Sequence, residues 1–100
     1  MTIIEKNRDK IIALCDKHRV ARLFVFGSVL TDKFNKNSDI DLLVDFSGVE
    51  LYDYAENYFS FKKSLEKLFK RQIDLLEDKA VKNPYLRRSI DSSKTMIYGL

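Results

Sequence analysis

The hydrophobic residues of this chain follow two periods, one typical of strands and one typical of helices. The run ARLFVFG, residues 21–27, is apolar and aromatic and ends in glycine, which predicts a short buried strand. The segment DIDLLVDF, residues 39–46, alternates between two faces. One face holds Ile40, Leu42, Val44 and Phe46, and the other holds Asp39, Asp41, Leu43 and Asp45. We therefore predict a second strand with one packed face and one face that carries acids.

Helical spacing marks both ends of the chain. Near the N-terminus, Thr2 and Glu5 are spaced as a capping box, and apolar residues then recur at helical intervals to about His18. Near the C-terminus, Asn83-Pro84 combines an N-cap residue with proline at the first helical position. The apolar positions that continue this last helix are Leu86, Ile90 and Ile97.

A longer helix is predicted over residues 51–70. Its apolar residues cover an arc of roughly 200°, about twice the stripe that one core contact requires. The part of the arc that exceeds the need of one core lies around the aromatic residues Tyr52, Tyr54, Tyr58 and Phe59. Two interpretations stay open: burial between two layers, or a surface for a partner or a second copy, and hence a homo-oligomer or hetero-oligomer.

The segment RQIDLLE, residues 71–77, predicts a third strand, which makes the element order α-β-β-α-β-α. This order predicts the mixed α/β (α+β) class, a small mixed β-sheet with helices packed against it. One hundred residues correspond to a single domain, residues 1–100.

The composition indicates the cellular compartment more than it indicates a chemical activity. Cys15 is the only cysteine, so an internal disulfide is excluded and a reducing cytoplasm is favoured. The N-terminal MTIIEKNRDK has no long apolar segment, which indicates neither a signal peptide nor a membrane span. A net charge of +3 permits contact with phosphates without predicting nucleic-acid binding.

Three aspartates are the strongest chemical signal. Asp39 and Asp41 are two residues apart on a strand, so their carboxylates project from the same face. Magnesium suits such a pair, because it takes oxygen ligands from one or two carboxylates and from substrate phosphates. Asp74 in the third strand completes the cluster if that strand lies beside the second. Three carboxylates could hold two Mg²⁺ ions for an in-line phosphoryl displacement.

Gly27 and Ser28 add a candidate phosphate cradle. Glycine at a strand end lets the backbone approach a ligand closely, and the following N–H groups can point at an anion. The serine adds a hydroxyl, and it can also cap a helix.

The spacing of these residues resembles a known signature. Gly27-Ser28, ten intervening residues and Asp39-Ile40-Asp41 are similar to the Gly-Ser-x10-Asp-x-Asp pattern of the polymerase-beta-like nucleotidyltransferase superfamily. The segments RQIDLLEDKAV and NPYLRRSIDSSKTMIYG resemble the C-terminal part of minimal nucleotidyltransferase (MNT) domains. The resemblance covers nearly the whole chain.

This resemblance implies a site and a partner. Gly27 and Ser28 would hold the triphosphate of ATP, Asp39 and Asp41 would bind Mg²⁺, and Asp74 would activate the acceptor hydroxyl. Such proteins are commonly encoded beside a HEPN-domain ribonuclease toxin, which the MNT antitoxin neutralises by transferring AMP onto it. Larger superfamily members bind their second substrate on an additional domain, so the acceptor site here is expected to come from another polypeptide or from self-association.

The stretch after Ser28 departs from the commonest family pattern. Val29, Thr31 and Asp32 stand where many relatives carry arginine or glycine, so a phosphate-contacting arginine is not supplied. Together with the wide aromatic arc, this favours a second hypothesis, a non-catalytic module that neutralises its partner by occlusion. Plain RNA binding ranks last, because an aromatic platform or RNA-binding signature is absent.

The other polar residues are given structural interpretations first. His18 falls at a helix C-terminus, where a cation favours the dipole, Cys15 is expected in the core, and Asp45 is read as a structural or loop-facing acid. Basic residues crowd the end of the 51–70 helix, either as a solvated face or as a contact for RNA or an acidic partner. They are Lys62, Lys63, Lys67, Lys70 and Arg71. A role near phosphates is open for Arg87 and Arg88.

Overall fold

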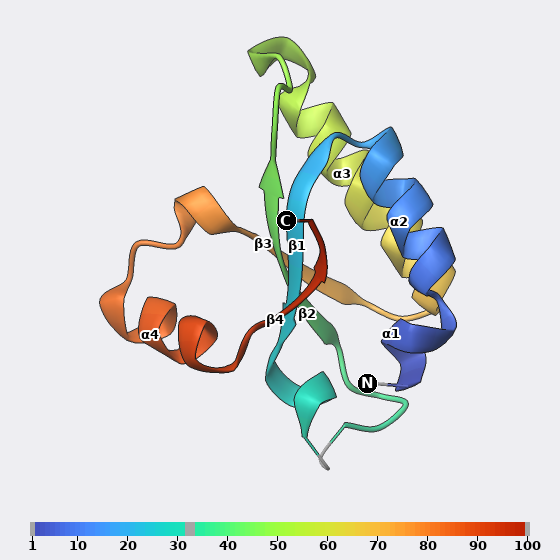
Figure 1. The fold of residues 1–100 in the computed structure, drawn as a ribbon, viewed down its shortest axis with the longest axis vertical. Coiled ribbons are helices and arrows are strands. Elements are labelled where there is room, and N and C mark those ends of the chain that lie inside the picture. Colours follow the sequence, from blue (N-terminus) through green and yellow to red (C-terminus); the bar gives the residue numbers. More distant parts are fainter. Residues whose placement is uncertain (1, 32–33, 100) are drawn as a thin grey trace.

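The computed structural model describes residues 2–31 and 34–99, apart from the side chains of Thr2, Ser28 and Val29. The chain contains both helices and strands, as expected from the two hydrophobic periods (Figure 1). In chain order they are α1 Thr2–Lys6, α2 Arg8–Lys17, β1 Val20–Phe26, the 3-10 helix η1 Gly27–Leu30, β2 Ile40–Phe46, α3 Leu51–Phe69, β3 Ile73–Glu77, the 3-10 helix η2 Asp78–Ala80, α4 Pro84–Ser93 and β4 Thr95–Tyr98.

The strands form one mixed sheet in the order β3-β2-β1-β4. The β1 strand pairs antiparallel with both β2 and β4, whereas β2 and β3 are parallel. Helices α2 and α3 lie side by side on one face, and α4 stands on the other side of the sheet (Figure 1). The predicted mixed α+β class with helices packed on a small mixed sheet is confirmed.

The prediction for the C-terminal residues was wrong at Ile97. Helix α4 ends at Ser93, and Ile97 lies buried in β4, which pairs with β1. The physical reason is that Thr95, Ile97 and Tyr98 have side chains that favour strands, and the exposed edge of β1 offers backbone partners. The helix start was predicted correctly, since the Asn83 Oδ1 accepts hydrogen bonds from the backbone N–H groups of Tyr85 and Leu86.

The N-terminal helix is interrupted once. Its pattern predicted one helix to about His18, but the structure has α1 and α2 separated at Asn7. The Asn7 side chain donates a hydrogen bond of 2.9 Å to the Ile3 carbonyl, which is an alternative to the regular helical ladder. The predicted capping contact of Thr2 involves a side chain outside the described part of the chain.

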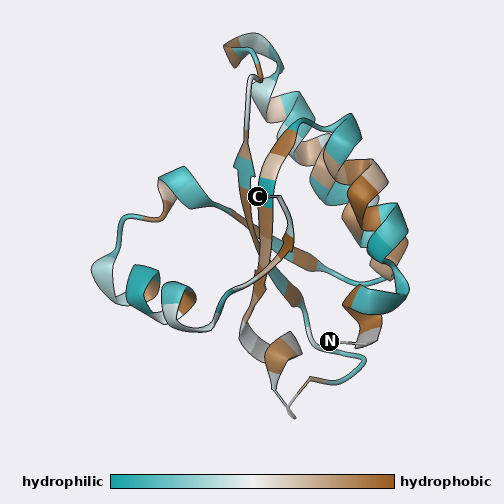
Figure 2. Ribbon diagram, viewed as in Figure 1, coloured by the Kyte–Doolittle hydropathy of each residue, from teal (hydrophilic) through white to brown (hydrophobic). Residues whose placement is uncertain are grey.

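The main core lies between the sheet and helices α1–α3. Hydrophobic residues follow the central strands and the inner sides of these helices (Figure 2). The core includes Leu23, Leu42, Phe61 and Leu65, each fully buried. On the opposite face of the sheet Leu43 is buried as well, and Ile90 of α4 is 1% exposed.

The edge strand β3 is covered by side chains of α3. The Tyr58 hydroxyl donates to the Leu75 carbonyl at 2.5 Å, and a Glu66 carboxylate oxygen accepts from the Ile73 N–H at 3.3 Å. Unpaired edge groups invite association with other strands, so these contacts protect the edge. Burial and the 2.6 Å hydrogen bond to Glu77 raise the pKa of Tyr54 to about 12, so its phenol stays protonated at neutral pH.

The wide aromatic arc of α3 therefore serves two environments. Tyr54 and Tyr58 point inward to β3, but Leu51, Tyr52 and Phe59 are 90%, 100% and 62% exposed. Burial between two layers accounts for the first group alone.

His18 and Cys15 have the structural roles predicted for them. His18 is 3% exposed, with Nδ1 at 2.8 Å from the Leu14 carbonyl and Nε2 at 3.1 Å from the Ser60 hydroxyl. Cys15 is fully buried in the core.

Cys15 is expected to be unreactive in the folded protein. Burial raises the pKa of its thiol to about 12, so the nucleophilic thiolate is scarce at pH 8. A colorimetric thiol reagent such as dithionitrobenzoate should react at pH 8 only after unfolding in guanidinium. Rapid labelling of the native protein, at the rate of the unfolded chain, would contradict this placement.

Candidate active site

One end of the sheet collects the chemically active residues that the sequence singled out. The β1 strand ends at Phe26, which pairs with Asp41 of β2, and Asp41 in turn pairs with Asp74 of β3. Gly27 follows Phe26 directly, and Asp39 directly precedes β2. Three neighbouring strands therefore deliver Gly27, Asp39, Asp41 and Asp74 to a common region.

Gly27 lies against the carboxylate of Asp41. Its φ is +77°, a conformation that residues with a Cβ adopt at a cost. A Cβ atom at this position would overlap the Asp41 Oδ2 and come within 3.2 Å of its Cγ. Glycine is thus required twice, by the backbone turn into η1 and by the space that the Asp41 carboxylate occupies.

The three aspartates differ in exposure. Asp41 is half-buried, whereas Asp39 and Asp74 are exposed. Asp41 and Asp74 are register partners in a parallel pair, so their side chains leave the same face of the sheet. Among the described residues, no group of three or more His, Cys, Asp or Glu side chains is assembled closely enough to hold a metal ion. A complete three-carboxylate ligand set stays a prediction.

The Gly-Ser cradle is described only in part. The backbone of Ser28 belongs to η1, but its side chain lies outside the described residues, as does all of Asp32. Thr31 is exposed. The assignment of Ser28 to a triphosphate stays a prediction.

Arg71 holds the loop that leads into Asp39, a role that the sequence analysis missed. Its guanidinium donates hydrogen bonds to the carbonyls of Asn35 at 3.0 Å and Ser38 at 2.9 Å. It also stacks 4.6 Å from the centre of the Phe34 ring. Arg71 therefore links the loop before β2 to the segment that begins β3. Its position at the end of a basic helix gave no signal of this, because the partners are backbone carbonyls more than thirty residues away.

Replacing Arg71 by alanine is expected to loosen this loop. Two charge-assisted hydrogen bonds and a cation–π contact would be lost, worth about 1–2 kcal/mol of unfolding free energy together. Amide hydrogen exchange should accelerate at Ser38 and Ile40, with Lys63→Ala on α3 as the control. Unchanged exchange at both amides would show that Arg71 does not hold the loop.

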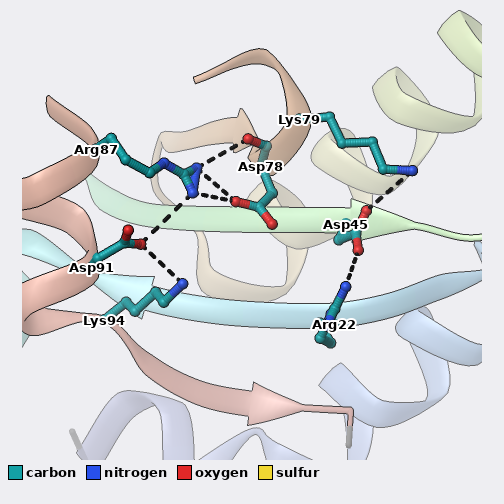
Figure 3. A network of polar contacts seen from close by, with 7 residues as sticks. All are labelled: Arg22, Asp45, Asp78, Lys79, Arg87, Asp91 and Lys94. Carbon is teal, nitrogen blue, oxygen red and sulfur yellow. Dashed lines mark hydrogen bonds and ion pairs between the residues drawn. The ribbon is translucent and has the colours of Figure 1, made fainter. Parts of the chain in front are cut away.

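Two groups of ion pairs lie around η2: one joins α4 to Asp78 of η2, and the other joins Lys79 of η2 to Asp45 of the sheet (Figure 3). Both terminal nitrogens of Arg87 lie 2.6 Å from the Asp78 carboxylate, and Lys94 lies 3.0 Å from Asp91. The role considered for Arg87 near phosphates thus competes with a tight structural pairing. Arg88 is exposed.

Asp45 is a structural acid, as expected. It is 7% exposed and lies 2.7 Å from Arg22 and 3.8 Å from Lys79 (Figure 3). It occupies the same face of β2 as Asp41, but these two cations neutralise it. The acidic face of β2 therefore holds two kinds of acid, the candidate metal ligand Asp41 and the buried, ion-paired Asp45, which the alternation of the sequence alone did not separate.

The chain matches known sequences over most of its length. Residues 8–97 match the family model described as a nucleotidyltransferase domain. The chain is 33% identical over 78 residues to the Methanocaldococcus jannaschii protein named "Putative protein adenylyltransferase MJ1379", covering 78% of this chain and 77% of that protein. It is 36% identical over 78 residues to "Putative protein adenylyltransferase MJ0128" of the same organism, covering 78% and 76%.

Solved structures share the fold. A protein described as a "putative minimal nucleotidyltransferase" is 31% identical, with a TM-score of 0.70 over 92% of this chain and 90% of that chain. A toxin-antitoxin structure with AMP-PNP matches at a TM-score of 0.72 and 20% identity, over 94% of this chain and 74% of that chain. A tri-AMPylated Shewanella oneidensis HEPN toxin in complex with MNT antitoxin matches at a TM-score of 0.66 and 18% identity, over 96% and 72%.

Proposed function

The chain belongs to the nucleotidyltransferase domain family, and from this premise we propose that it is the antitoxin of a toxin–antitoxin pair. Its reaction is the transfer of AMP from ATP to a hydroxyl group of a HEPN-type ribonuclease toxin. We place this activity in the cytoplasm and in residues 1–100 acting as one minimal domain. No helix among the described residues is long and apolar enough to cross a membrane.

Two independent similarities to other proteins, one in sequence and one in fold, support the proposed reaction. Relatives more than 30% identical carry the name "Putative protein adenylyltransferase", which specifies AMP as the transferred group and a protein as the acceptor. Structures of the same fold occur with AMP-PNP and with an AMPylated HEPN toxin. The observation that carries the proposal to this chain is the contact of Gly27 with Asp41, with Asp74 in register beside them.

The donor set fits magnesium. Carboxylate oxygens from Asp39 and Asp41 suit a hard cation that takes its remaining ligands from substrate phosphates and water. Asp74 could add a third carboxylate for a second ion. When bound, Mg²⁺ would neutralise negative charge on the triphosphate oxygens.

The residues of the chain then have separate tasks. Gly27 leaves the Asp41 carboxylate in place and lets the backbone approach the triphosphate, which Ser28 also contacts. The oxygen of the acceptor hydroxyl attacks the α-phosphorus of ATP and forms a new bond to it. The bond between the α-phosphorus and the oxygen that bridges it to the β-phosphate breaks, which releases pyrophosphate. Asp74 accepts the proton that the acceptor hydroxyl loses.

The test is transfer of label from ATP carrying a labelled α-phosphate. The acceptor is a purified HEPN-type ribonuclease from the same organism, with Mg²⁺ present. Label should appear in the toxin band with the wild-type protein and disappear on metal chelation. Label in neither protein, under conditions where the two form a stable complex, would refute the proposed reaction.

A second candidate function is neutralisation by occlusion, without catalysis. Its support is the exposure of Leu51, Tyr52 and Phe59 on α3, a set of apolar side chains that a tightly bound partner could bury. The two functions separate in cells. An Asp39→Asn/Asp41→Asn variant should fail to protect against the toxin if transfer is required, and should protect fully if occlusion suffices.

A further inference from the structure

A groove of about 600 Å³ runs between α2 and α3, and lysines from both helices form its walls. Lys10 and Lys17 come from α2, Lys67 lies in the last turn of α3, and Lys70 is the residue that caps the C-terminus of α3. All four are exposed. The basic end of α3 noted in the sequence is therefore one wall of a larger feature, to which α2 contributes the other wall.

The floor of this lysine groove is apolar. Leu14 and Leu68 are half-buried and pack against the main core, with their remaining surface open to the groove. A strip of apolar surface between two rows of cations matches the surface of an amphipathic helix whose apolar stripe is flanked by acids.

The positive charge of the groove is not compensated. No ion pair among the described residues involves any of the four lysines. Two acids adjacent to these lysines in sequence are engaged elsewhere: Asp16 accepts a hydrogen bond from the Tyr98 hydroxyl, and Glu66 accepts from the backbone N–H of Ile73. An acidic ligand would therefore meet these lysines without first breaking an ion pair of the described residues.

The groove is separate from the candidate active site. Helices α2 and α3 cover one face of the sheet, the face onto which Ile40 and Leu42 pack (Figure 1). Asp41 alternates with these residues and projects from the opposite face. A ligand in the groove would leave the region of Gly27, Asp41 and Asp74 open.

We propose that the lysine groove is a docking site for an acidic amphipathic helix of a partner protein. The helix would add a third member to the α2–α3 layer, with leucine-type side chains on Leu14 and Leu68 and carboxylates facing the lysines. The floor favours a peptide over RNA, because it offers aliphatic side chains and no aromatic ring on which a base could stack. This docking site does not depend on the proposed AMP transfer.

The probe is a synthetic, fluorescein-labelled helical peptide of about 18 residues, or five turns, with leucines at i, i+3, i+4 and i+7 and glutamates on both flanks. Binding to the full chain is followed by fluorescence anisotropy. We expect saturable binding that weakens with salt, and at least about tenfold weaker binding by the variant Lys10→Glu/Lys67→Glu. Amide resonances of Leu14 and Leu68 should shift on addition of the peptide.

The matched control is Lys63→Glu/Lys82→Glu, which makes the same charge change at exposed positions outside the groove and should bind the peptide like wild type. Circular dichroism melts verify folding, and the neutral pair Lys10→Gln/Lys67→Gln should lose affinity to an intermediate degree. The proposal is overturned if the peptide does not bind, if the groove variant binds as well as wild type, or if a scrambled peptide of equal composition binds equally. Tighter binding of single-stranded RNA than of the peptide would also overturn it.

Discussion

Replacing Asp41 by asparagine is expected to lower AMP transfer by about three orders of magnitude or more, while the protein stays folded. The change removes one negative charge from the proposed Mg²⁺ site, and stabilisation of phosphate charge is the main contribution to this kind of reaction. Asparagine has nearly the same shape, so the space beside Gly27 remains filled. The measurement is the initial rate of label transfer from ATP, together with a thermal melt. Asp39→Asn should behave in the same way.

Asp45→Asn is the matched control for this experiment. Asp45 lies on the same face of the same strand, four residues further along, but it is buried against Arg22 and Lys79. Its replacement should lower the unfolding free energy, because the buried Asp45 loses its charge and with it the charge-assisted hydrogen bond from Arg22. Transfer by the folded fraction should persist. If Asp41→Asn retains activity like that of Asp45→Asn, the assignment of the metal site to Asp39 and Asp41 is wrong.

Replacing Gly27 by alanine is expected to lower transfer by about a hundredfold or more and to destabilise the fold by about 1–3 kcal/mol. The alanine would adopt a φ near +77° at a cost of about 1 kcal/mol, and its Cβ would push the Asp41 carboxylate out of place. A displacement of about 1 Å in such a group is enough for this loss of rate. Label transfer and the denaturation midpoint give the two quantities.

The variant Gly48→Ala distinguishes the cost of a positive φ from the effect of a clash with the Asp41 carboxylate. Gly48 has a similar φ of +71°, but a Cβ there would meet no atom within 4 Å. This variant should lose about 1 kcal/mol of stability and keep its transfer rate. Equal activity of the two alanine variants would mean that the Asp41 carboxylate moves without functional cost, contrary to the proposed site.

The hydrophobic periods of the sequence predicted local structure well in segments that pack against the core along their whole length. The β1 and β2 strands, α3 and the N-cap of α4 were recovered to within a residue or two, because periods of 2 and 3.6 residues reflect which side chains face a core. The same argument failed at Ile97. Its helical spacing from Ile90 was accidental, and the open edge of β1 decided that it forms a strand.

The candidate site shows a similar division. The Gly27-Ser28 and Asp39/Asp41 pairs were visible as a spaced motif, and the later match to a nucleotidyltransferase family model agrees with the family that the motif indicated. Arg71 was not visible as a loop anchor, since its partners are carbonyls, which every residue carries. Asp41 and Asp45 of β2 could be assigned different roles only from their neighbours in the tertiary structure.

What the sequence by itself determined is the set of elements and the motif, because both depend on residues close together in the chain. The tertiary structure decided how these pieces meet. The parallel pairing of β2 and β3 sets Asp74 opposite Asp41, and the packing of α2 on α3 joins two lysine rows into one groove. Such arrangements depend on contacts between distant segments, whose free energy comes from burying surface that no local pattern describes.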